Sequence, residues 1–194
     1  MSHKILIATH NKNKLAEFQQ ILPKIKFISL SDLGDDEEFI EDGQTLEENS
    51  YLKADHYFTK YQIPTIADDT GLEVYALNNR PGVHSQRYSG GDDSDNNTKL
   101  LSELSLHTNR QARFRCVLTY FASEDEIIQF DGILEGEIAK EVKGNAGFGY
   151  DPIFVIPSKQ QTVAELGMEF KNSYSHRAEA VKLFKEYLDD NSRN

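Results

Sequence analysis

The sequence predicts an α/β protein in which helices pack on a mixed β-sheet, and three observations support this class. Strand-like and helix-like segments alternate near the N-terminus, which favours parallel strands. Later segments alternate apolar and polar residues across short turns, which favours antiparallel pairing. The 194 residues, of which 38% are hydrophobic, can build a substantial core. We therefore expect one domain over residues 1–194, arranged as two lobes with a cleft between them.

The first segments predict alternating strands and helices. The run Lys4–Thr9 is almost continuously apolar, as buried parallel strands tend to be. Asn11 or Asn13 can cap an amphipathic helix that Pro23 ends. Ile25–Leu30 then predicts a second strand.

An acidic loop, a capped helix and a third strand are expected next. Seven of the eleven residues 32–42 are acidic, which favours a solvated loop. A capping-box signature opens a predicted helix over 45–61. Ile63–Ala67 predicts a strand that ends at the adjacent carboxylates Asp68 and Asp69.

The second half predicts antiparallel strands and a final helix. The alternation over Ala112–Ala122 indicates a half-buried strand in which Cys116 is a buried small hydrophobe. Ile127–Leu134 is expected to pair with it as a hairpin. The other expected elements are a loop over 78–95, a short helix around Leu100, strands over 137–142 and 153–156, and a helix over 175–188.

Composition and charge restrict the classes of partner. The formal net charge of −11 repels polyanions, so no nucleic-acid partner is expected. No apolar run approaches the roughly 18 residues of a membrane span, so no membrane association is expected. The single cysteine allows no internal disulfide. Together these features predict a cytoplasmic protein.

The most informative chemical feature is the Asp68-Asp69 pair after a predicted strand. Open α/β sheets bind ligands at the carboxyl ends of their strands, and hard cations prefer oxygen donors of this kind. Glu41 could add a carboxylate from a second segment. The alternatives are an Asp-rich turn and a solvated acid, because Asp is common in turns.

A second candidate is the segment between the first strand and helix, where backbone N–H groups and lysines could bind an anion. It lacks the glycines of a Walker A loop, and a capped helix with exposed lysines is the alternative. The residues of this segment are Thr9, His10, Asn11, Lys12, Asn13 and Lys14.

Two further candidates lie near the C-terminus. Glycines surround Phe148 in the segment 147–152, so the backbone could approach a ligand while the ring stacks on it. The alternative is a turn with a buried Phe. Lys171, His176 and Arg177 place donors near a helix N-terminus, where the helix dipole favours anions, and an oxygen-rich ligand would resolve this mismatch. A plain serine cap is the alternative there.

Six motifs in one order carry a resemblance to a known family. They are Thr-x-Asn-x-x-Lys from Thr9, Glu41, Ala-Asp-Asp-Thr-Gly-Leu from Ala67, Pro-Gly-Val-x-Ser from Pro81, Phe-Gly-Tyr-Asp-Pro from Phe148, and Ser-His-Arg from Ser175. Together they resemble the noncanonical purine nucleoside triphosphate pyrophosphatases, also called inosine/xanthosine triphosphate pyrophosphatases, from Ile5 to about Leu188. His84 and Gln86 depart from the Tyr and Ala that are frequent in this family.

The resemblance implies an elongated mixed sheet with helices, two lobes around a nucleotide-binding cleft, and a homodimer. It implies that Glu41 and Asp69 hold Mg²⁺, that Asp69 is also the general base, and that Asp68 supports it. It further implies that the nucleotide contacts Thr9, His10, Asn11, Lys12, Asn13, Lys14, Thr70, Phe148, Gly149, Tyr150, Asp151, Lys171, His176 and Arg177.

The implied activity is hydrolysis of ITP, dITP and XTP to the nucleoside monophosphate and pyrophosphate, which removes deaminated purines from the nucleotide pool. In this interpretation Asp69 activates a water bound to Mg²⁺. The donors His176 and Arg177 suit a 6-oxo purine better than a 6-amino purine. Two alternatives stay open: a nucleotide-binding sensor without turnover, and an aspartyl-phosphate phosphatase, which usually has a spaced Asp-x-Asp pair.

Overall fold

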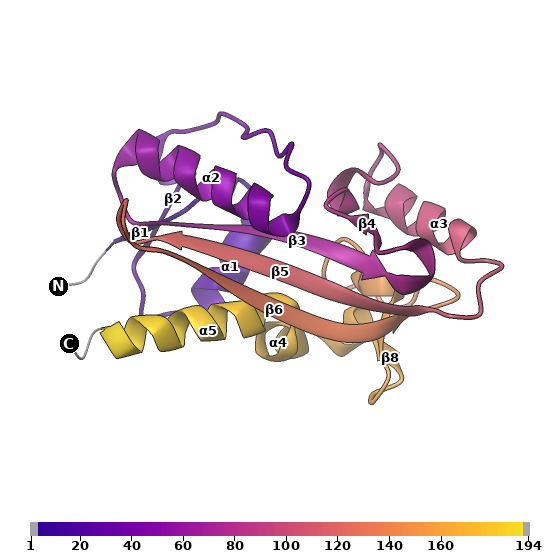
Figure 1. Cartoon of the computed structure of the whole chain (residues 1–194). Coiled ribbons are helices and arrows are strands. Elements are labelled where there is room, and N and C mark those ends of the chain that lie inside the picture. The colour runs from indigo at the N-terminus through magenta and orange to yellow at the C-terminus, as the bar shows by residue number, and fades with distance from the viewer. Residues whose placement is uncertain (1–3, 192–194) are drawn as a thin grey trace. The chain divides into compact units, whose positions relative to one another are not determined.

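The computed structural model describes residues 4–191, which form two compact units (Figure 1). The first unit holds the described residues up to Asp69, Cys116–Gly132, and the described residues from Ala178 onward. The second unit holds Thr70–Arg115 and Ile133–Arg177. The strands β3, β5 and β6 contribute residues to both units.

The strands form one mixed sheet in the order β2-β1-β3-β5-β6-β7-β8, with β4 paired to β3. β1 is parallel to β2 and β3, whereas β4 is antiparallel to β3 and β7 is antiparallel to β6 and β8. The predicted α/β class with a mixed sheet is confirmed. The strands are β1 (Ile5–Ile7), β2 (Phe27–Ser29), β3 (Thr65–Val74), β4 (Arg80–Gly82), β5 (Gln111–Phe121), β6 (Ile127–Ile138), β7 (Phe154–Ile156) and β8 (Gln161–Thr162).

Helix starts follow the capping signals of the sequence. Asn11 caps the first helix through the backbone N–H groups of Asn13 and Lys14, and Thr45 caps the second through that of Glu48. The helices are α1 (Lys12–Ile21), α2 (Leu46–Tyr61), α3 (Asp93–Glu103), α4 (Val163–Tyr174) and α5 (His176–Asn191). Short 3₁₀ helices cover Ser31–Leu33, Tyr75–Leu77, Ser85–Arg87 and Asp151–Ile153.

The first unit has an apolar cluster on each face of its strands, because alternate strand residues face opposite sides. In β1, Ile5 and Ile7 pack with residues of α1 and α5, whereas Leu6 and the following Ala8 pack with residues of α2. Figure 1 accordingly shows α2 and α5 on opposite sides of these strands. Cys116 is fully buried in the α1 and α5 cluster, as predicted.

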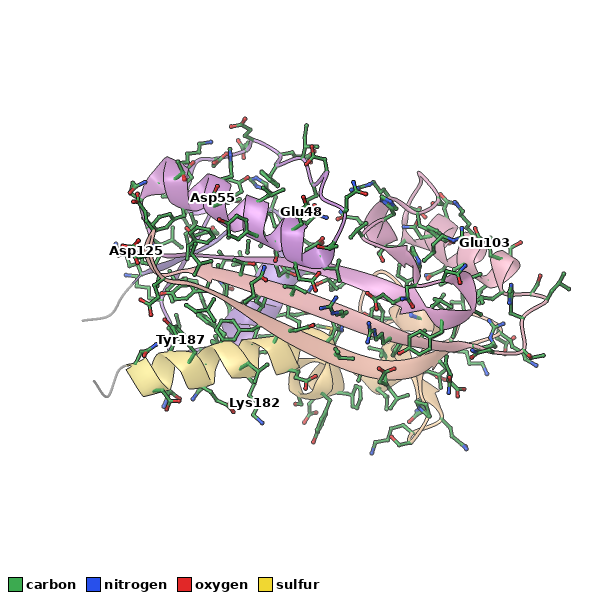
Figure 2. All side chains as sticks on the ribbon, in the orientation of Figure 1. Glu48, Asp55, Glu103, Asp125, Lys182 and Tyr187 are labelled. Carbon is green, nitrogen blue, oxygen red and sulfur yellow. The ribbon has the colours of Figure 1, made fainter. Side chains whose placement is uncertain are left out.

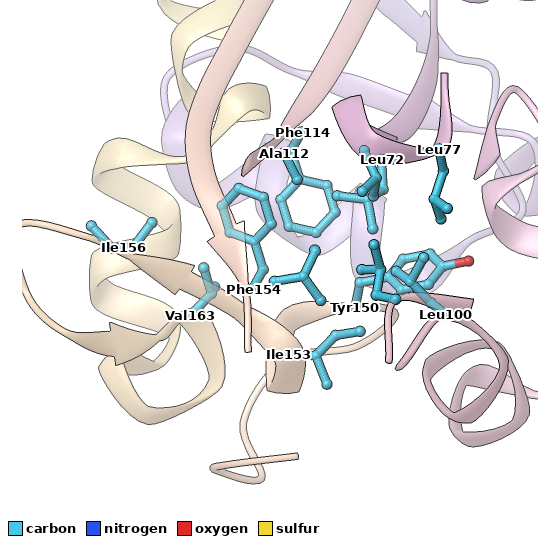
Figure 3. Packing of buried hydrophobic residues seen from close by; sticks show 13 residues of the cluster. Leu72, Leu77, Leu100, Ala112, Phe114, Tyr150, Ile153, Phe154, Ile156 and Val163 are labelled. Carbon is cyan, nitrogen blue, oxygen red and sulfur yellow. The ribbon is translucent and has the colours of Figure 1, made fainter. Parts of the chain in front are cut away.

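The second unit has its own core, which Figure 3 shows from close by. The rings of Phe114 and Phe154 lie 4.4 Å apart between centroids, and Phe154 is fully buried. Leu72 of β3, Leu100 of α3 and Tyr150 belong to the same cluster. This core supports the loop that carries Phe148.

Several predicted elements differ from the structure. The separate strand expected over 137–142 is wrong, because β6 continues to Ile138 without a break. The expected loop over 78–95 contains β4, a 3₁₀ helix and the start of α3, which Asp92 caps. The helix α4 was not predicted. Its sequence includes Gly167 at φ 79°, a non-helical conformation that interrupts the periodic pattern.

Charged side chains cover the outer sides of the helices. Glu48 on α2 and Lys182 on α5 are exposed and Asp55 on α2 is half-buried, and Figure 2 labels all three. Within residues 4–191, no helix is long and apolar enough to cross a membrane.

Candidate functional site

The structure places Asp68 and Asp69 inside β3 rather than behind it. The prediction that a strand over Ile63–Ala67 ends at this pair is therefore wrong. The parallel neighbour β1 does end here, because its last residue, Ile7, lies opposite Ile66. The two acids thus lie just beyond the carboxyl end of β1, at the kind of edge where α/β sheets bind ligands.

The alternation of β3 separates the two acids. Ile66 belongs to the apolar cluster of α1 and α5, whereas Ala67 belongs to that of α2. By the same alternation Asp68 faces the α1 side and Asp69 faces the α2 side. Only 1% of Asp68 and 5% of Asp69 is exposed, so each carboxylate depends on its protein partners.

On the α1 side, Asp68 forms an ion pair with Lys14. The Lys14 Nζ lies 2.9 Å from Asp68 Oδ2, and the lysine side chain is 14% exposed. Lys14 is in the first turn of α1, directly after the segment that leaves β1. Asp68 therefore holds one of the lysines of the predicted anion-binding segment.

On the α2 side, α2 brings Asp69 and Glu41 together. Asn49 Nδ2 donates to Asp69 Oδ2 at 2.9 Å, and Lys53, one turn further along α2, forms an ion pair with Glu41. The Glu41 side chain is 22% exposed and that of Lys53 is 9% exposed. This set, Glu41, Asn49, Lys53 and Asp69, is called the carboxylate group below.

The charges of the carboxylate group shift one another's pKa. Burial, and then the negative charge of Glu41, raise the pKa of Asp69 above its ordinary value. For Lys53, burial acts to lower the pKa, but Glu41, Asp68 and Asp69 outweigh it and the pKa is raised. Lys53 therefore stays charged. A raised pKa makes Asp69 a better proton acceptor than an exposed aspartate.

The segment from Thr9 to Lys14 is already hydrogen-bonded within itself. The Asn11 Oδ1 accepts from the N–H groups of Asn13 at 2.9 Å and Lys14 at 3.3 Å. Thr9 Oγ1 accepts from the N–H of Asn11 at 3.1 Å. The sequence predicted that backbone N–H groups of this segment could bind an anion, whereas these three donate to the side chains of Thr9 and Asn11 in the structure. The side chains of Lys12 and Asn13 are exposed.

The acidic loop is anchored rather than wholly solvated. Asp35 is buried and accepts from Tyr61 Oη at 2.5 Å and from Lys60 Nζ at 3.0 Å. The Glu37 carbonyl oxygen accepts from His10 Nε2 at 2.9 Å. The loop that carries Glu41 is thereby tied to the end of α2 and to the segment after β1.

In the second unit, Arg177 contacts Thr70 and the neighbouring His176 contacts Phe114. Arg177 Nη2 donates to Thr70 Oγ1 at 3.1 Å, and the arginine is only 1% exposed. The His176 ring stacks on Phe114 with centroids 4.8 Å apart. His176 is the first residue of α5, as the sequence predicted for its donor pair.

The glycine-rich loop is organised by Asp151 and Lys171. Asp151 Oδ2 accepts from the N–H of Phe148 at 2.9 Å and pairs with Lys171 Nζ at 2.6 Å. The same Nζ lies 3.6 Å from the centre of the Phe148 ring, a cation–π contact. Tyr150 is buried, and its hydroxyl donates to the Ser85 carbonyl oxygen at 2.8 Å.

The carboxylate group has features that suit a divalent cation. Its donors are hard oxygens, and the repulsion between Glu41 and Asp69 is of the kind that a cation relieves. In this structure Lys53 neutralises the charge of Glu41 through an ion pair, so a bound ion would share the Glu41 carboxylate with the lysine. Within residues 4–191, no cluster of three or more His, Cys, Asp or Glu has metal-binding geometry. Glu41 and Asp69 are thus the two protein carboxylates that would hold such an ion.

The Ham1 family profile matches residues 5–187. The chain belongs to the Ham1 family. A dITP/XTP pyrophosphatase of Desulfotalea psychrophila is 46% identical over 181 residues, which cover 91% of this chain and 81% of the relative. One of Flavobacterium psychrophilum is 44% identical over 188 residues, which cover 95% of this chain and 98% of the relative.

Solved Ham1 structures have the same fold. The Staphylococcus aureus Ham1 protein superposes with a TM-score of 0.89 at 40% identity, covering 97% of this chain and 99% of the other. The Coxiella burnetii HAM1 protein gives 0.90 at 39% identity with the same coverage. The predicted resemblance is confirmed.

Two residues of this Ham1 family member's carboxylate group were missed from the sequence. Asn49 and Lys53 lie on the predicted α2 at positions one turn apart. A lysine on a charged helix normally indicates a solvated face, so nothing local marked Lys53 as buried. The apolar residues at positions 46, 54 and 58 mark the buried face of α2. Helical periodicity puts positions 49 and 53 on the same face, and this was the signal that the sequence contained. His84 and Gln86 are exposed.

Proposed function

We infer that this chain hydrolyses dITP, XTP and ITP to the nucleoside monophosphate and pyrophosphate. The observation that carries this inference is the 46% identity to a dITP/XTP pyrophosphatase over 91% of the chain. The carboxylate group supports it, because a buried Asp with a raised pKa beside basic residues suits water activation near a polyphosphate. The whole chain from 1 to 194 is proposed to act as one catalytic domain.

In this proposal, residues of the first unit bind the phosphates of the nucleotide. Lys14, held by Asp68, and the exposed Lys12 supply positive charge in a chain of net charge −11. His10 and the polar side chains of Thr9, Asn11 and Asn13 are further candidates. Because the cap of α1 uses the N–H groups of Asn13 and Lys14, we assign phosphate binding mainly to side chains.

Asp69 is the proposed general base. Asn49 donates to its Oδ2, and this hydrogen bond fixes the orientation of the carboxylate that would accept a proton from the water. Glu41 and Asp69 would hold Mg²⁺, which would neutralise charge on the phosphates and acidify water. Asp68 faces the other side of β3, so its proposed part is to hold Lys14.

Residues of the second unit are proposed to bind the base and sugar. The Phe148 ring is held by its backbone bond to Asp151 and by Lys171, and it can stack on a purine. Gly149 and Tyr150 form the adjoining backbone. The buried donors Arg177 and His176, near Thr70, suit the 6-oxo group of hypoxanthine or xanthine and leave a 6-amino group unmatched.

The site of action and the assembly are also proposals. We expect a homodimer that acts on the nucleotide pool of the cytoplasm, with neither nucleic acid nor membrane as a partner. Sedimentation of the purified protein gives the oligomeric state, and a monomer at micromolar concentration would contradict the dimer.

The activity is tested with purified protein, Mg²⁺ and the triphosphates of deoxyinosine, xanthosine, deoxyguanosine and deoxyadenosine. Release of pyrophosphate rather than orthophosphate is expected, with dITP and XTP much faster than dATP. Equal rates for all substrates would refute the specificity. Tight nucleotide binding without product would instead support the sensor alternative, and trapping of a phosphorylated enzyme would support the phosphatase.

A further inference from the structure

The backbone of Gly149 is held from both sides by one helix. Its N–H donates to Asp93 Oδ2 at 2.7 Å, and its carbonyl oxygen accepts from Asn97 Nδ2 at 3.0 Å. Because a carbonyl oxygen only accepts, the amide nitrogen of Asn97 has to face Gly149. Asp93 and Asn97 are one turn apart on α3, so they project from the same side of the helix.

These two bonds fix the peptide groups on both sides of Gly149. The N–H lies in the plane of the Phe148–Gly149 peptide, and the carbonyl lies in that of the Gly149–Tyr150 peptide. Gly149 has φ 63°, and a Cβ there would meet no atom within 4 Å, so no neighbouring group packs against that side of the residue. The hydrogen bonds from α3 restrain this backbone together with the bond from the Asp151 N–H to the Phe148 carbonyl oxygen at 3.3 Å, and Asn97 is only 5% exposed.

The restraint reaches Phe148 directly. Asp93 orients the peptide that leaves Phe148, while Asp151 holds the N–H that enters it at 2.9 Å. Lys171 lies over one face of the ring. Hydrogen bonds to the peptide groups before and after Phe148 therefore hold the residue that carries the ring. The bonds from α3 come from residues that belong to none of the six motifs of the family resemblance.

We propose that Asp93 and Asn97 are positioning residues for the purine base. By clamping Gly149 they hold Phe148 in place, so they set the affinity for the base and leave triphosphate binding unchanged. The proposal rests on the proposed function, in which Phe148 contacts the base. It adds α3 as a determinant of base recognition.

The test compares a substrate with a base and a ligand without one. The Michaelis constant for dITP and the inhibition constant of inorganic tripolyphosphate are measured for Asp93→Ala, Asn97→Ala and Asn97→Asp. Asn97→Asp keeps the volume, removes the donor and places a carboxylate against the carbonyl oxygen. Ser94→Ala and Thr98→Ala are the matched controls, because both residues are exposed on the same helix.

Loss of either bond is expected to raise KM for dITP about ten-fold, with kcat and the tripolyphosphate constant unchanged. Asn97→Asp should raise KM at least as much as Asn97→Ala, and the controls should match the wild type. A wild-type KM in Asp93→Ala and both Asn97 variants would overturn the proposal. So would an equal rise in the tripolyphosphate constant. A wild-type protein that hydrolyses no dITP would instead refute the proposed function itself.

Discussion

At the scale of single residues, strand geometry gives the two adjacent acids different partners. Asp68 pairs with Lys14, whereas Asp69 is held by Asn49 and feels the charge of Glu41. An aspartyl-phosphate mechanism receives no support from this arrangement, because the second acid is turned to the other face. The proposed division into a base and a supporting residue is thus consistent with alternation along β3.

Replacing Asp69 should remove most of the activity with little change in fold. In Asp69→Asn the amide oxygen can still accept from Asn49, but the residue can no longer take a proton. We expect kcat for dITP to fall by about 100- to 10,000-fold. Asp68→Asn is the matched comparison, and its smaller loss should appear mainly in KM. Circular dichroism checks the fold, and wild-type kcat in Asp69→Asn would contradict the assignment.

At the scale of elements, the acidic loop is docked on the C-terminal end of α2. The bond from Tyr61, and then that from Lys60, lower the pKa of Asp35 from 3.8 to about 2. The Glu37 N–H also donates to Asp35 Oδ1, at 3.0 Å. Five of the seven acids lie within 32–38, so the composition indicated a solvated loop. The buried contacts of one member could not be predicted because its partners are about 25 positions away.

The docking of this loop predicts a pH-dependent stability. The folded-state pKa of Asp35 lies below its unfolded value, so its contribution is complete above about pH 4 and is lost as the pH falls toward about 2. Asp35→Asn should therefore lower the free energy of unfolding most at pH 7, and less as the pH approaches 3. Urea unfolding at several pH values measures this. The exposed neighbour Asp36 gives the control Asp36→Asn, and a pH-independent difference for Asp35→Asn would contradict the assignment.

At the scale of the whole molecule, the described residues have three apolar clusters, two in the first unit and one in the second. The long strands β3, β5 and β6 supply residues to both units. The sequence predicted one domain, and that stays a prediction. In β5 nothing in the periodicity marked a boundary, because the strand continues from Arg115 to Cys116 without a turn signal.

Matched substitutions in the two units test how stability is divided. Phe184 packs on Tyr120 and Phe130 in the first unit, and Phe154 packs on Phe114 in the second. Because both are fully buried, Phe184→Ala and Phe154→Ala should each cost about 3–5 kcal/mol. Hydrogen exchange should speed up first in Cys116–Gly132 for the former and in Ile133–Arg177 for the latter. Equal acceleration everywhere in both variants would indicate one cooperative unit.

The sequence by itself determined the mixed α/β class, the cap at Thr45 and the candidate acids, because each depends on periodicity or on residues close together in the chain. It left the first cap open between Asn11 and Asn13, where the structure identifies Asn11. It misplaced the end of β3, since Thr70 and Gly71 after two acids resemble a turn. Only the tertiary structure decided which partners meet: Lys53 with Glu41, and α3 with Gly149. Such contacts join segments 12 to 56 positions apart, and their geometry follows from packing rather than from local pattern.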